Sequence, residues 1–595
     1  MKKIAYLFLL ICFTANVKAA TSITASSVSG HWTLAGSPYM IYNDIYVDYG
    51  SVLIIDPGVD VVFYGAYGMH VNGSLYATGA TVQPITFHAN DTTGWYNTST
   101  AAGSWKGITF GIYGIPSTDS SSFQFCKVYD CKTNALALFY RNLKIDNSTF
   151  FHNSGFVVNV YLDTFNKYEM SNCAVYNNTS SVTCFTNLGN VNIHNCSFHD
   201  NASRTNMLSV NKGNLLLNDN LFYQNNQTDS QNTTTIDIEY SNAVVMGNKV
   251  HDNTSEFDGA ISAYYSNVDI VGNYVCNNLS LINMISGSSC GSTQGGGGIR
   301  LSAEGDTVNK YNYTIRNNII ANNDARYAGG AIYIIGANAN IFNNQIINNT
   351  AYNGGAIHMF NNVSSSGHRC VKVKNNLFYG NITTNFALPN PHANLEISSG
   401  DTIEYEYNWT ENPFYTDNIN VGFGYNFLLG DTTKNIIGTD PRMVSPTSSA
   451  GVTVNASTSN FFLLPASPCI DAGDTTGAAP YSVDYARNTR IYGSRIDIGA
   501  FEFNPTAYAT LNTNIPVPEK TISVYPNPAN NIIFVSVPGA KGKIELQDIS
   551  GKQIIGKNVT NTLTSFDIHA LPRGIYFAIW NDGSGSKTAQ KILVE

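Results

Sequence analysis

Three side chains that could take part in acid–base chemistry occupy equivalent positions in consecutive repeated segments. They are Arg300, Tyr333 and His358, and each stands between two apolar residues, the first of which is always isoleucine. Successive residues of a strand point to opposite faces, so the apolar pair points inward and the polar residue between them points outward. We therefore predict one exposed column in which the three side chains follow each other at about 5 Å.

An exposed column of this composition could serve a polysaccharide lyase. A tyrosine or lysine would abstract the proton beside a uronate carboxyl group, while the arginine or the histidine neutralises that carboxylate. The simpler alternative is a solvated sheet face that carries mixed polar side chains. No pair of catalytic carboxylates recurs in the repeats, since Asp237, Glu239, Glu304 and Asp306 form no repeated set.

A second candidate is the aromatic-rich stretch from residue 403 to residue 427. Tyr405, Tyr407 and Trp409 alternate with other residues, so a continuous strand would place all three on one face. Such a face could stack on sugar rings. It could equally cover an apolar patch where the fold closes, and we favour this second interpretation.

A repeat of about 25 residues organises the segments that hold these candidates. Two asparagines mark each repeat, and the residue three positions before the second one is always apolar or aromatic. Short alternating strands at this period predict an all-β fold, a right-handed parallel β-helix, with asparagines stacked at its corners. The predicted first set is Asn147, Asn172, Asn195, Asn220, Asn248, Asn273, Asn318, Asn344 and Asn376, and the second set is Asn153, Asn178, Asn201, Asn226, Asn253, Asn278, Asn323, Asn349 and Asn381.

The N-terminus and the charge restrict where the protein works. Residues 1–19 have the pattern of a secretory signal peptide, with two lysines, a short apolar run and small residues before the cleavage point. The formal net charge of −9 argues against nucleic acid as a partner. No later segment predicts a transmembrane helix. The scattered cysteines predict buried thiols with one or two disulfides, such as Cys126–Cys131 or Cys276–Cys290.

Two parts of the chain resemble surface proteins of known fold. The stretch from residue 51 to residue 90, followed by Trp105-Lys106-Gly107, resembles the first coils of secreted right-handed parallel β-helix proteins. Residues 440–503 resemble the closing region of the choice-of-anchor Q family, on the residues Asp440-Pro441, Ser467-Pro468-Cys469-Ile470-Asp471-Ala472-Gly473, Arg487 and Asp497-Ile498-Gly499-Ala500-Phe501-Glu502. These resemblances imply a fold and leave the activity open.

The closing region is rich in aspartates that could bind Ca²⁺. Asp471, Asp474 and Asp497 offer the oxygen ligands that calcium prefers. The alternative is that these carboxylates accept hydrogen bonds from backbone N–H groups in turns. We expect no other cofactor.

The C-terminal segment resembles the type A sorting domain of the type IX secretion system of Bacteroidetes. The match rests on Tyr525-Pro526-Asn527-Pro528, Gly551-Lys552, Leu571, Gly574-Ile575-Tyr576 and Lys591-Ile592-Leu593-Val594. The resemblance implies a small β-sandwich and, as partners, the secretion machinery and its sortase-like peptidase. It also implies that the remaining chain is anchored to surface lipopolysaccharide or released.

The predicted organisation is a signal peptide (1–19), a β-helix (20–439), its closing region (440–503), a linker (504–519) and a sorting domain (520–595). We predict a secreted or cell-surface protein that binds a glycan or another surface, as an adhesin does. The alternatives are a uronate polysaccharide lyase and a structural surface protein without a specific ligand.

Overall fold

A computed structural model describes most of the chain. The described residues are 20–97, 99–179, 182–186, 188–227, 233–281, 295–306, 308, 310–360, 369–385, 395–397, 402–411, 418–419, 427–429, 431–438, 440–476, 483–505, 523–525, 532–537, 542–548, 551–559, 563–581 and 587–594. The chain divides into two compact units, Met1–Phe503 and Asn504–Glu595. No helix in the described part of the chain is long and apolar enough to cross a membrane.

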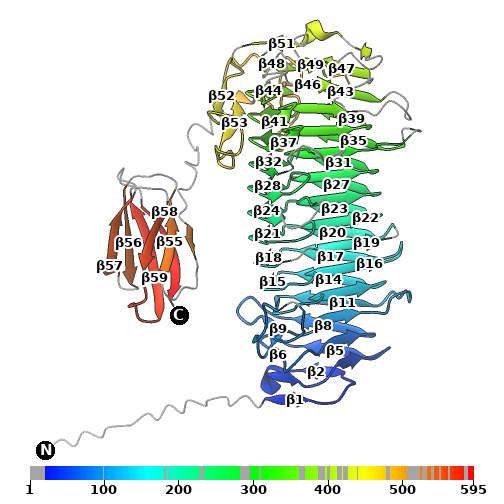
Figure 1. The fold of residues 1–595 in the computed structure, drawn as a ribbon, viewed down its shortest axis with the longest axis vertical. Coiled ribbons are helices and arrows are strands. Elements are labelled where there is room, and N and C mark those ends of the chain that lie inside the picture. Colours follow the sequence, from blue (N-terminus) through cyan, green and yellow to red (C-terminus); the bar gives the residue numbers. More distant parts are fainter. Residues whose placement is uncertain are drawn as a thin grey trace, which may run out of the picture. The chain divides into compact units, whose positions relative to one another are not determined.

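The first unit is a parallel β-helix, the predicted fold class, built from three long sheets (Figure 1). Each coil runs from sheet B to sheet C, then to sheet A, and then to sheet B of the next coil. Each inner strand of these sheets pairs in parallel with the equivalent strands of the coils before and after it, and each end strand pairs with one neighbour. Stacked coils lie about 4.8 Å apart.

The strands of the three sheets follow in order of stacking. Sheet A contains β1 (Thr21–Ile23), β3 (Tyr39–Ile41), β6 (Asp60–Phe63), β9 (Ile85–Ala89), β12 (Cys126–Tyr129), β15 (Thr149–Phe151), β18 (Ala174–Tyr176), β21 (Ser197–His199), β24 (Leu221–Tyr223), β28 (Lys249–His251), β32 (Tyr274–Cys276), β36 (Ile319–Ala321), β40 (Gln345–Ile347), β44 (Leu377–Tyr379), β48 (Trp409–Thr410) and β51 (Ile436–Ile437). Sheet B contains β4 (Ile45–Val47), β7 (Met69–Val71), β10 (Ile108–Phe110), β13 (Leu136–Phe139), β16 (Val158–Leu162), β19 (Val182–Thr186), β22 (Leu208–Asn211), β26 (Ile236–Glu239), β30 (Ile261–Tyr264), β34 (Ile299–Ser302), β38 (Ile332–Ile335), β42 (Ile357–Phe360), β46 (Leu395–Ile397) and β49 (Asn418–Ile419). Sheet C contains β2 (Gly30–Trp32), β5 (Val52–Ile55), β8 (Ser74–Thr78), β11 (Ser120–Gln124), β14 (Asn142–Asp146), β17 (Lys167–Ser171), β20 (Asn190–His194), β23 (Asn214–Asn218), β27 (Asn242–Met246), β31 (Asn267–Val271), β35 (Asn312–Arg316), β39 (Asn338–Phe342), β43 (Cys370–Lys374), β47 (Thr402–Glu406) and β50 (Phe427–Leu429).

A short fourth sheet, sheet D, joins the coils between sheets A and B in the second half of the helix. Its strands are β25 (Asn226–Gln227), β29 (Thr254–Ser255), β33 (Leu279–Ser280), β37 (Asp324–Ala328), β41 (Thr350–Asn353) and β45 (Ile382–Thr383). Among its described residues, the first unit also contains two 3-10 helices, η1 (Leu34–Gly36) and η4 (Thr432–Lys434), and the antiparallel strands β52 (Met443–Ser445) and β53 (Asn460–Leu463).

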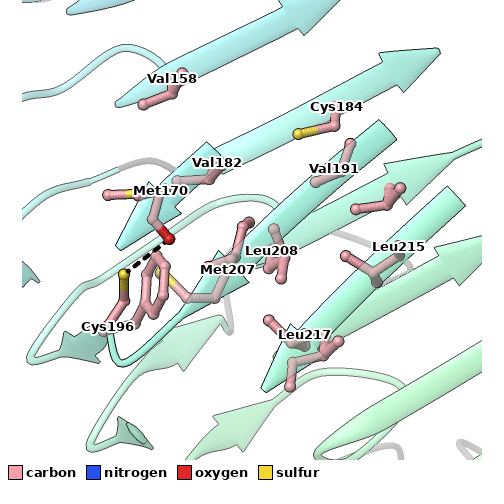
Figure 2. Packing of buried hydrophobic residues seen from close by; sticks show 14 of the residues in the cluster. Val158, Met170, Val182, Cys184, Val191, Cys196, Met207, Leu208, Leu215 and Leu217 are labelled. Carbon is pink, nitrogen blue, oxygen red and sulfur yellow. Dashed lines mark hydrogen bonds between the residues drawn. The ribbon is translucent and has the colours of Figure 1, made fainter. Parts of the chain in front are cut away.

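The interior of the helix is a continuous apolar core. Inward-pointing residues of the strands stack on their equivalents in the next coil, as Val158, Val182 and Leu208 of three successive coils do in Figure 2. Burial of this kind removes apolar surface from water at about 25 cal/mol per Å² and supplies most of the stability. The eight cysteines in the described ranges are free thiols, so the predicted pair Cys126–Cys131 is wrong. Cys276 is also free, and Cys290 lies outside the described residues.

Two internal ladders of side chains cross the corners, as the repeat predicts, although some members differ from the prediction by one position. In each ladder the side-chain oxygen or sulfur of one residue accepts a hydrogen bond from the backbone N–H of its equivalent in the preceding coil, as Asn178 accepts from Asn153 at 3.0 Å. The first ladder is Cys126, Ser148, Cys173, Cys196, Asn220, Asn248, Asn273, Asn318, Asn344, Asn376, Asn408 and Asn435. The second is Cys131, Asn153, Asn178, Asn201, Asn225, Asn253, Asn278, Asn323, Asn349 and Asn381.

Four of the predicted ladder asparagines therefore lie outside the ladders. Asn147, Asn172 and Asn195 precede the true ladder residues and have a positive φ of 47° to 54°. Asn226 follows Asn225 and begins β25. The reason is that each corner needs two residues: one in the left-handed backbone region, which asparagine tolerates, and then one whose side chain points inward.

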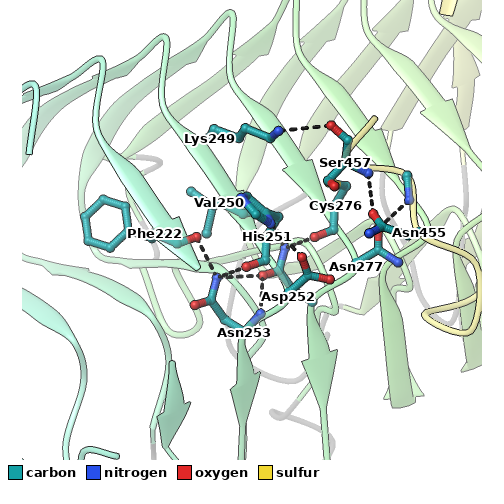
Figure 3. A network of polar contacts seen from close by, with 12 residues as sticks. Phe222, Lys249, Val250, His251, Asp252, Asn253, Cys276, Asn277, Asn455 and Ser457 are labelled. Carbon is teal, nitrogen blue, oxygen red and sulfur yellow. Dashed lines mark hydrogen bonds and ion pairs between the residues drawn. The ribbon is translucent and has the colours of Figure 1, made fainter. Parts of the chain in front are cut away.

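The closing region, residues 440–503, lies on the outer face of sheet A in the later coils (Figure 3). The amide of Asn277 donates to Val454 O at 2.7 Å and accepts from Ala456 N at 2.7 Å. Lys249 Nζ donates to Ser457 O at 3.0 Å. Apolar side chains of both parts, among them Ile347 and Phe461, form a shared cluster. The closing region thus covers strands of sheet A that would otherwise expose apolar residues.

The second unit contains two antiparallel sheets around one apolar core. One sheet consists of β54 (Ser523–Tyr525), β55 (Ile532–Ser536) and β58 (Leu563–Asp567), and the other consists of β57 (Gln553–Asn558), β56 (Lys543–Asp548), β59 (Gly574–Asn581) and β60 (Lys587–Val594). Residues of both sheets, such as Ile533 and Leu546, are fully buried in the shared core. This is the predicted small β-sandwich.

Candidate functional site

The predicted column on sheet B has the expected register and a different environment. Arg300 pairs with Tyr333, and Tyr333 pairs with His358, in adjacent parallel strands. The three side chains are nevertheless buried, at 3%, 0% and 4% exposure. The predicted exposure of this column is therefore wrong.

Arg300 is engaged in a buried polar network. Its Nη1 lies 3.1 Å from Asp258 Oδ2, and its guanidinium lies 4.1 Å from the centre of the Tyr264 ring. The same carboxylate oxygen accepts hydrogen bonds from Ser262 Oγ at 3.1 Å and from Tyr264 Oη at 2.8 Å. A buried ion pair of this kind cannot give up one partner without leaving an uncompensated charge.

Tyr333 and His358 contact each other edge to face, with ring centres 5.3 Å apart. Tyr333 also packs in a small apolar cluster with Ala328 and Ile335. His358 Nδ1 lies 3.6 Å from Glu396 Oε1, and Glu396 Oε2 accepts a hydrogen bond from Gly354 N at 2.8 Å.

The protonation states of these groups do not suit the roles of a lyase. Burial lowers the pKa of His358 to about 3, so its ring is neutral at ordinary pH. Burial also raises the pKa of Tyr333, which makes its phenolate less accessible as a base. Arg300 already neutralises Asp258. The column thus has neither a base nor a free cation among its three predicted members.

Alternation along a strand correctly predicts that the three side chains point outward from the helix interior. It does not predict which other residues cover them. Gly295 and Gly296 pass close to the column, because a Cβ atom placed on Gly295 would lie 3.3 Å from the ring of Tyr333, and one placed on Gly296 would lie 3.0 Å from Cβ of Arg300. Gly329 and Gly354 likewise stand four residues before Tyr333 and His358, and a Cβ on either would lie 2.7 or 2.8 Å from Cβ of that residue. The turn that leads into each strand therefore lies against the predicted site.

The three aromatic residues near the end of the helix do not share a face. Tyr405 belongs to the internal core, whereas Trp409 packs in the cluster under the closing region. Tyr407 is partly exposed, has a φ of 56°, and lies 5.3 Å from the charged groups of both Lys434 and Arg495. The alternation breaks because β47 ends at Glu406 and the corner begins at Tyr407. The position of Trp409 agrees with the apolar-patch interpretation.

The candidate calcium ligands accept hydrogen bonds from the chain itself. Asp471 Oδ1 accepts from Ser494 N at 2.7 Å and from Arg495 N at 2.9 Å. Asp497 accepts from the backbone of Asp471 and Phe503 at 2.6 Å each, and Asp474 accepts from Thr476. Within the described ranges, no group of three or more His, Cys, Asp or Glu side chains could hold a metal ion. This geometry corresponds to the alternative of backbone-bonded turns.

A surface that the repeat pattern did not single out lies on the outer face of sheet C. An open groove of about 920 Å³ is lined by side chains of β17, β20, β23, β27, β31 and β35. Its outermost row is asparagine in five consecutive coils: Asn190, Asn214, Asn242, Asn267 and Asn312. The signal was present in the sequence as an asparagine at the start of each of these strands, but it resembled the corner asparagines.

Two half-exposed apolar side chains lie beside the asparagine row. Leu216 and Val244 belong to neighbouring strands, line the groove, and are 40% and 38% exposed. Two tyrosines stand at the corner that precedes the row, since Tyr240 and Tyr265 each come two residues before an asparagine of the row. Their rings stack at 5.2 Å, and Tyr240 is 47% exposed. The groove therefore combines amide groups with apolar surface, and the two tyrosines stand at the corner beside it.

Sheet A carries a further aromatic row on its outer face before the closing region begins. Neighbouring rings stack at 4.7 to 5.6 Å with interplanar angles of 3° to 16°. The row is His88, Tyr129, Phe151, Tyr176, His199, Tyr223 and His251. Because the rings stack face to face, only their edges are available to a ligand.

The predicted sorting residues occupy turns and strands of the second unit. Gly551 has a φ of 82°, and Lys552 N donates to Asp548 Oδ1 at 3.1 Å in the same hairpin turn. Gly574 begins β59, and Tyr576 Oη donates to Pro572 O at 2.8 Å. Tyr525 ends β54, whereas Pro526, Asn527 and Pro528 lie outside the described residues.

Comparison with protein families agrees with both units. Residues 14–178 match the right-handed β-helix region family, and residues 523–595 match the secretion system C-terminal sorting domain family. The chain is a β-helix protein with a type IX sorting domain. This domain indicates export to the cell surface or into the medium through the type IX machinery. The resemblance of residues 440–503 to the choice-of-anchor Q family stays a prediction.

Solved structures with a similar fold have low sequence identity. The A-module of mannuronan C-5 epimerase AlgE6 from Azotobacter vinelandii is 15% identical, with a TM-score of 0.31, over 58% of this chain and 91% of that chain. The enzymatically active domain of tailspike protein 2 from bacteriophage CBA120 is 12% identical, with a TM-score of 0.21, over 96% of this chain and 72% of that one. No curated protein sequence matches the chain. Likeness at this level carries no information about activity.

Proposed function

We propose that this exported protein binds a polysaccharide in the groove on sheet C. The observation that carries the proposal is that one open groove combines a continuous row of asparagine amides with two neighbouring half-exposed apolar side chains, Leu216 and Val244. A sugar ring presents hydroxyl groups at its rim and C–H groups on its faces. Amides can bind the first, and apolar or aromatic side chains can pack against the second.

The position of the groove also suits a surface-exposed binding protein. It is open along the sheet, so a long chain can enter from the side without threading. The sorting domain indicates delivery to the cell exterior, where such chains are found. We expect the sortase-like peptidase to remove the sorting domain and the β-helix to be anchored to lipopolysaccharide or released, which the mass of the exported form would reveal.

Binding without turnover is favoured over a lyase for a specific reason. The three residues proposed for proton abstraction and charge neutralisation are buried, and each is engaged within the fold. A lyase needs a base and a cation that reach the substrate. The polysaccharide lyase and the ligand-free structural protein therefore become outcomes of the test.

The test is a binding assay on the exported protein with a panel of immobilised polysaccharides. Val244→Arg places a large charged side chain in the groove and should abolish binding, because Val244 lines the groove and is only half-buried. Ile54→Arg is the matched control, since Ile54 is 41% exposed at the same strand position of sheet C but outside the groove. No binding to any polysaccharide, or equal binding by both variants, would contradict the proposal. Release of unsaturated uronate products would establish the lyase instead.

A further inference from the structure

We infer that the ligand of the sheet C groove is an uncharged, hydroxyl-rich chain that runs along the helix axis with one sugar unit per coil. This inference rests on the proposed function and adds the class of the ligand and its direction. Three features of the groove lead to it: the placement of charge, the unused hydrogen-bonding capacity of the asparagine row, and the repeat distance of the coils.

Charge is confined to the two ends of the groove. Glu169 at one end lies 2.8 Å from Lys144, and Asp269 towards the other end makes a two-point ion pair with Arg316 at 2.6 and 3.0 Å. Lys167 is the remaining charged residue among the lining residues, and it lies on the same end strand as Glu169. A polyuronate carries one carboxylate per sugar and would need cations along the whole groove. The lining of the central strands β20, β23 and β27 contains none.

The asparagine row is half-used by its own members. Asn242 Nδ2 donates to Asn214 Oδ1 at 3.4 Å, and Asn267 Nδ2 donates to Asn242 Oδ1 at 3.2 Å. A primary amide has two N–H groups and an oxygen with two lone pairs. Asn242 thus keeps one donor and one acceptor site for a ligand, and a hydroxyl group, which both donates and accepts, matches this pair.

The direction of the ligand chain follows from the way equivalent side chains are arranged in rows along the helix axis. Equivalent residues repeat along the axis at about 4.8 Å, whereas across the sheet each strand offers only two or three outward positions. Six strands line the groove, so its end strands lie about 24 Å apart. One sugar unit of an extended chain is close in length to one coil spacing. A chain along the axis can therefore repeat the same contact at each of the five coils that carry the asparagine row.

The experiment measures affinity for neutral and acidic glycans at low and high salt, with β-glucan, mannan, polygalacturonate and alginate as probes. We expect a neutral glycan to bind with affinity that salt does not change, because no ion pair is formed. Affinity should rise with oligosaccharide length up to about six units, the number of coils in the groove, and then level off.

Two variants sharpen the result. Asn242→Asp removes the free N–H donor and should weaken neutral glycans about three- to tenfold, the effect of one hydrogen bond. Asn142→Asp is the control, because Asn142 holds the same row position on β14, outside the groove. Salt-sensitive binding of uronates alone, or a plateau at two or three sugar units, would overturn this inference while the proposed function stands. Failure of every polysaccharide to bind would overturn both.

Discussion

Substitution of Asn178 should destabilise the protein, whereas substitution of the adjacent Asn177 by glycine should have almost no effect. Asn177 lies in the left-handed region with a φ of 53°, and its side chain is exposed. Asn178 is 1% exposed and belongs to the second ladder. The pair thus tests whether the repeated asparagines hold the fold by two separate mechanisms, one of the backbone and one of the side chain.

The expected loss of stability in Asn178→Ala follows from the hydrogen bonds that this side chain makes. Its Oδ1 accepts from the backbone N–H of Asn153 at 3.0 Å, and its Nδ2 donates to Phe150 O and Tyr176 O at 3.0 Å each. Alanine leaves the buried N–H of Asn153 without this acceptor, and Phe150 O loses one donor. An orphaned buried group costs about 1–3 kcal/mol, so the local loss should be about 2–4 kcal/mol.

Asn177→Gly should change stability by less than about 0.5 kcal/mol, because glycine adopts the left-handed region without strain and no buried contact is lost. This variant is the control for the ladder substitution. The two changes affect neighbouring positions in the same coil. A difference in stability between the two variants therefore reports the separate roles of the two asparagines.

Hydrogen exchange followed by mass spectrometry is the appropriate measurement, because a stack of repeats opens locally and need not unfold in one step. In Asn178→Ala the peptide that contains Asn153 should exchange roughly thirty-fold faster or more, the factor that corresponds to 2 kcal/mol. Peptides of the second unit should not change. Equal protection in both variants, or equal loss in both, would refute the assignment of separate roles.

Two further substitutions test a buried carboxyl group, Asp237, and a closely packed glycine, Gly330. Burial and nearby Glu239 raise the pKa of Asp237 to about 8, so the folded state holds a proton that the unfolded state releases near pH 4. Stability should therefore fall as pH rises from 4 to 8. In urea titrations Asp237→Asn should flatten this fall, and an unchanged dependence of stability on pH would contradict the raised pKa. Gly330→Ala should destabilise the coils by several kcal/mol, because a Cβ there would lie 2.2 Å from Gly355 O. Gly272→Asn is the control and should be neutral in the same assay, because Gly272 has a φ of 60° and no atom lies within 4 Å of the added Cβ.

The fold was accessible from the sequence because its determinants are local and repeated. Alternation within each strand specified which residues enter the core, and the alignment of Ile299, Ile332 and Ile357 predicted the register that the parallel strands have. The corner ladders were predicted as a feature of the fold. Three of the four members that differ by one position do so because the ladder residue is a serine or a cysteine, and the fourth is Asn225 in place of Asn226. Cys173, for example, accepts a hydrogen bond from Ser148 N at 3.5 Å, as a ladder asparagine would.

The site was less accessible because alternation within a strand does not show what packs against an outward side chain. Gly296, Gly329 and Gly354 each stand four residues before a column residue and pack against it, and the alternation rule takes no account of this turn. In the same way, the alternation of Tyr405, Tyr407 and Trp409 assumes a strand that continues, whereas a corner begins at Tyr407. Periodicity therefore predicts which way a side chain points, and tertiary structure decides whether solvent or a ligand can reach it.

The three long sheets differ in what already occupies their outer faces. On sheet B, the charged and aromatic residues of the later coils are buried and paired with each other. On sheet A, the closing region covers the later coils, and the earlier coils carry rings that already stack on one another. The groove on sheet C differs, because each amide of its row uses only part of its hydrogen-bonding capacity within the protein. Unused capacity in a regular array is what a repeating ligand requires, and this is why we place the ligand there.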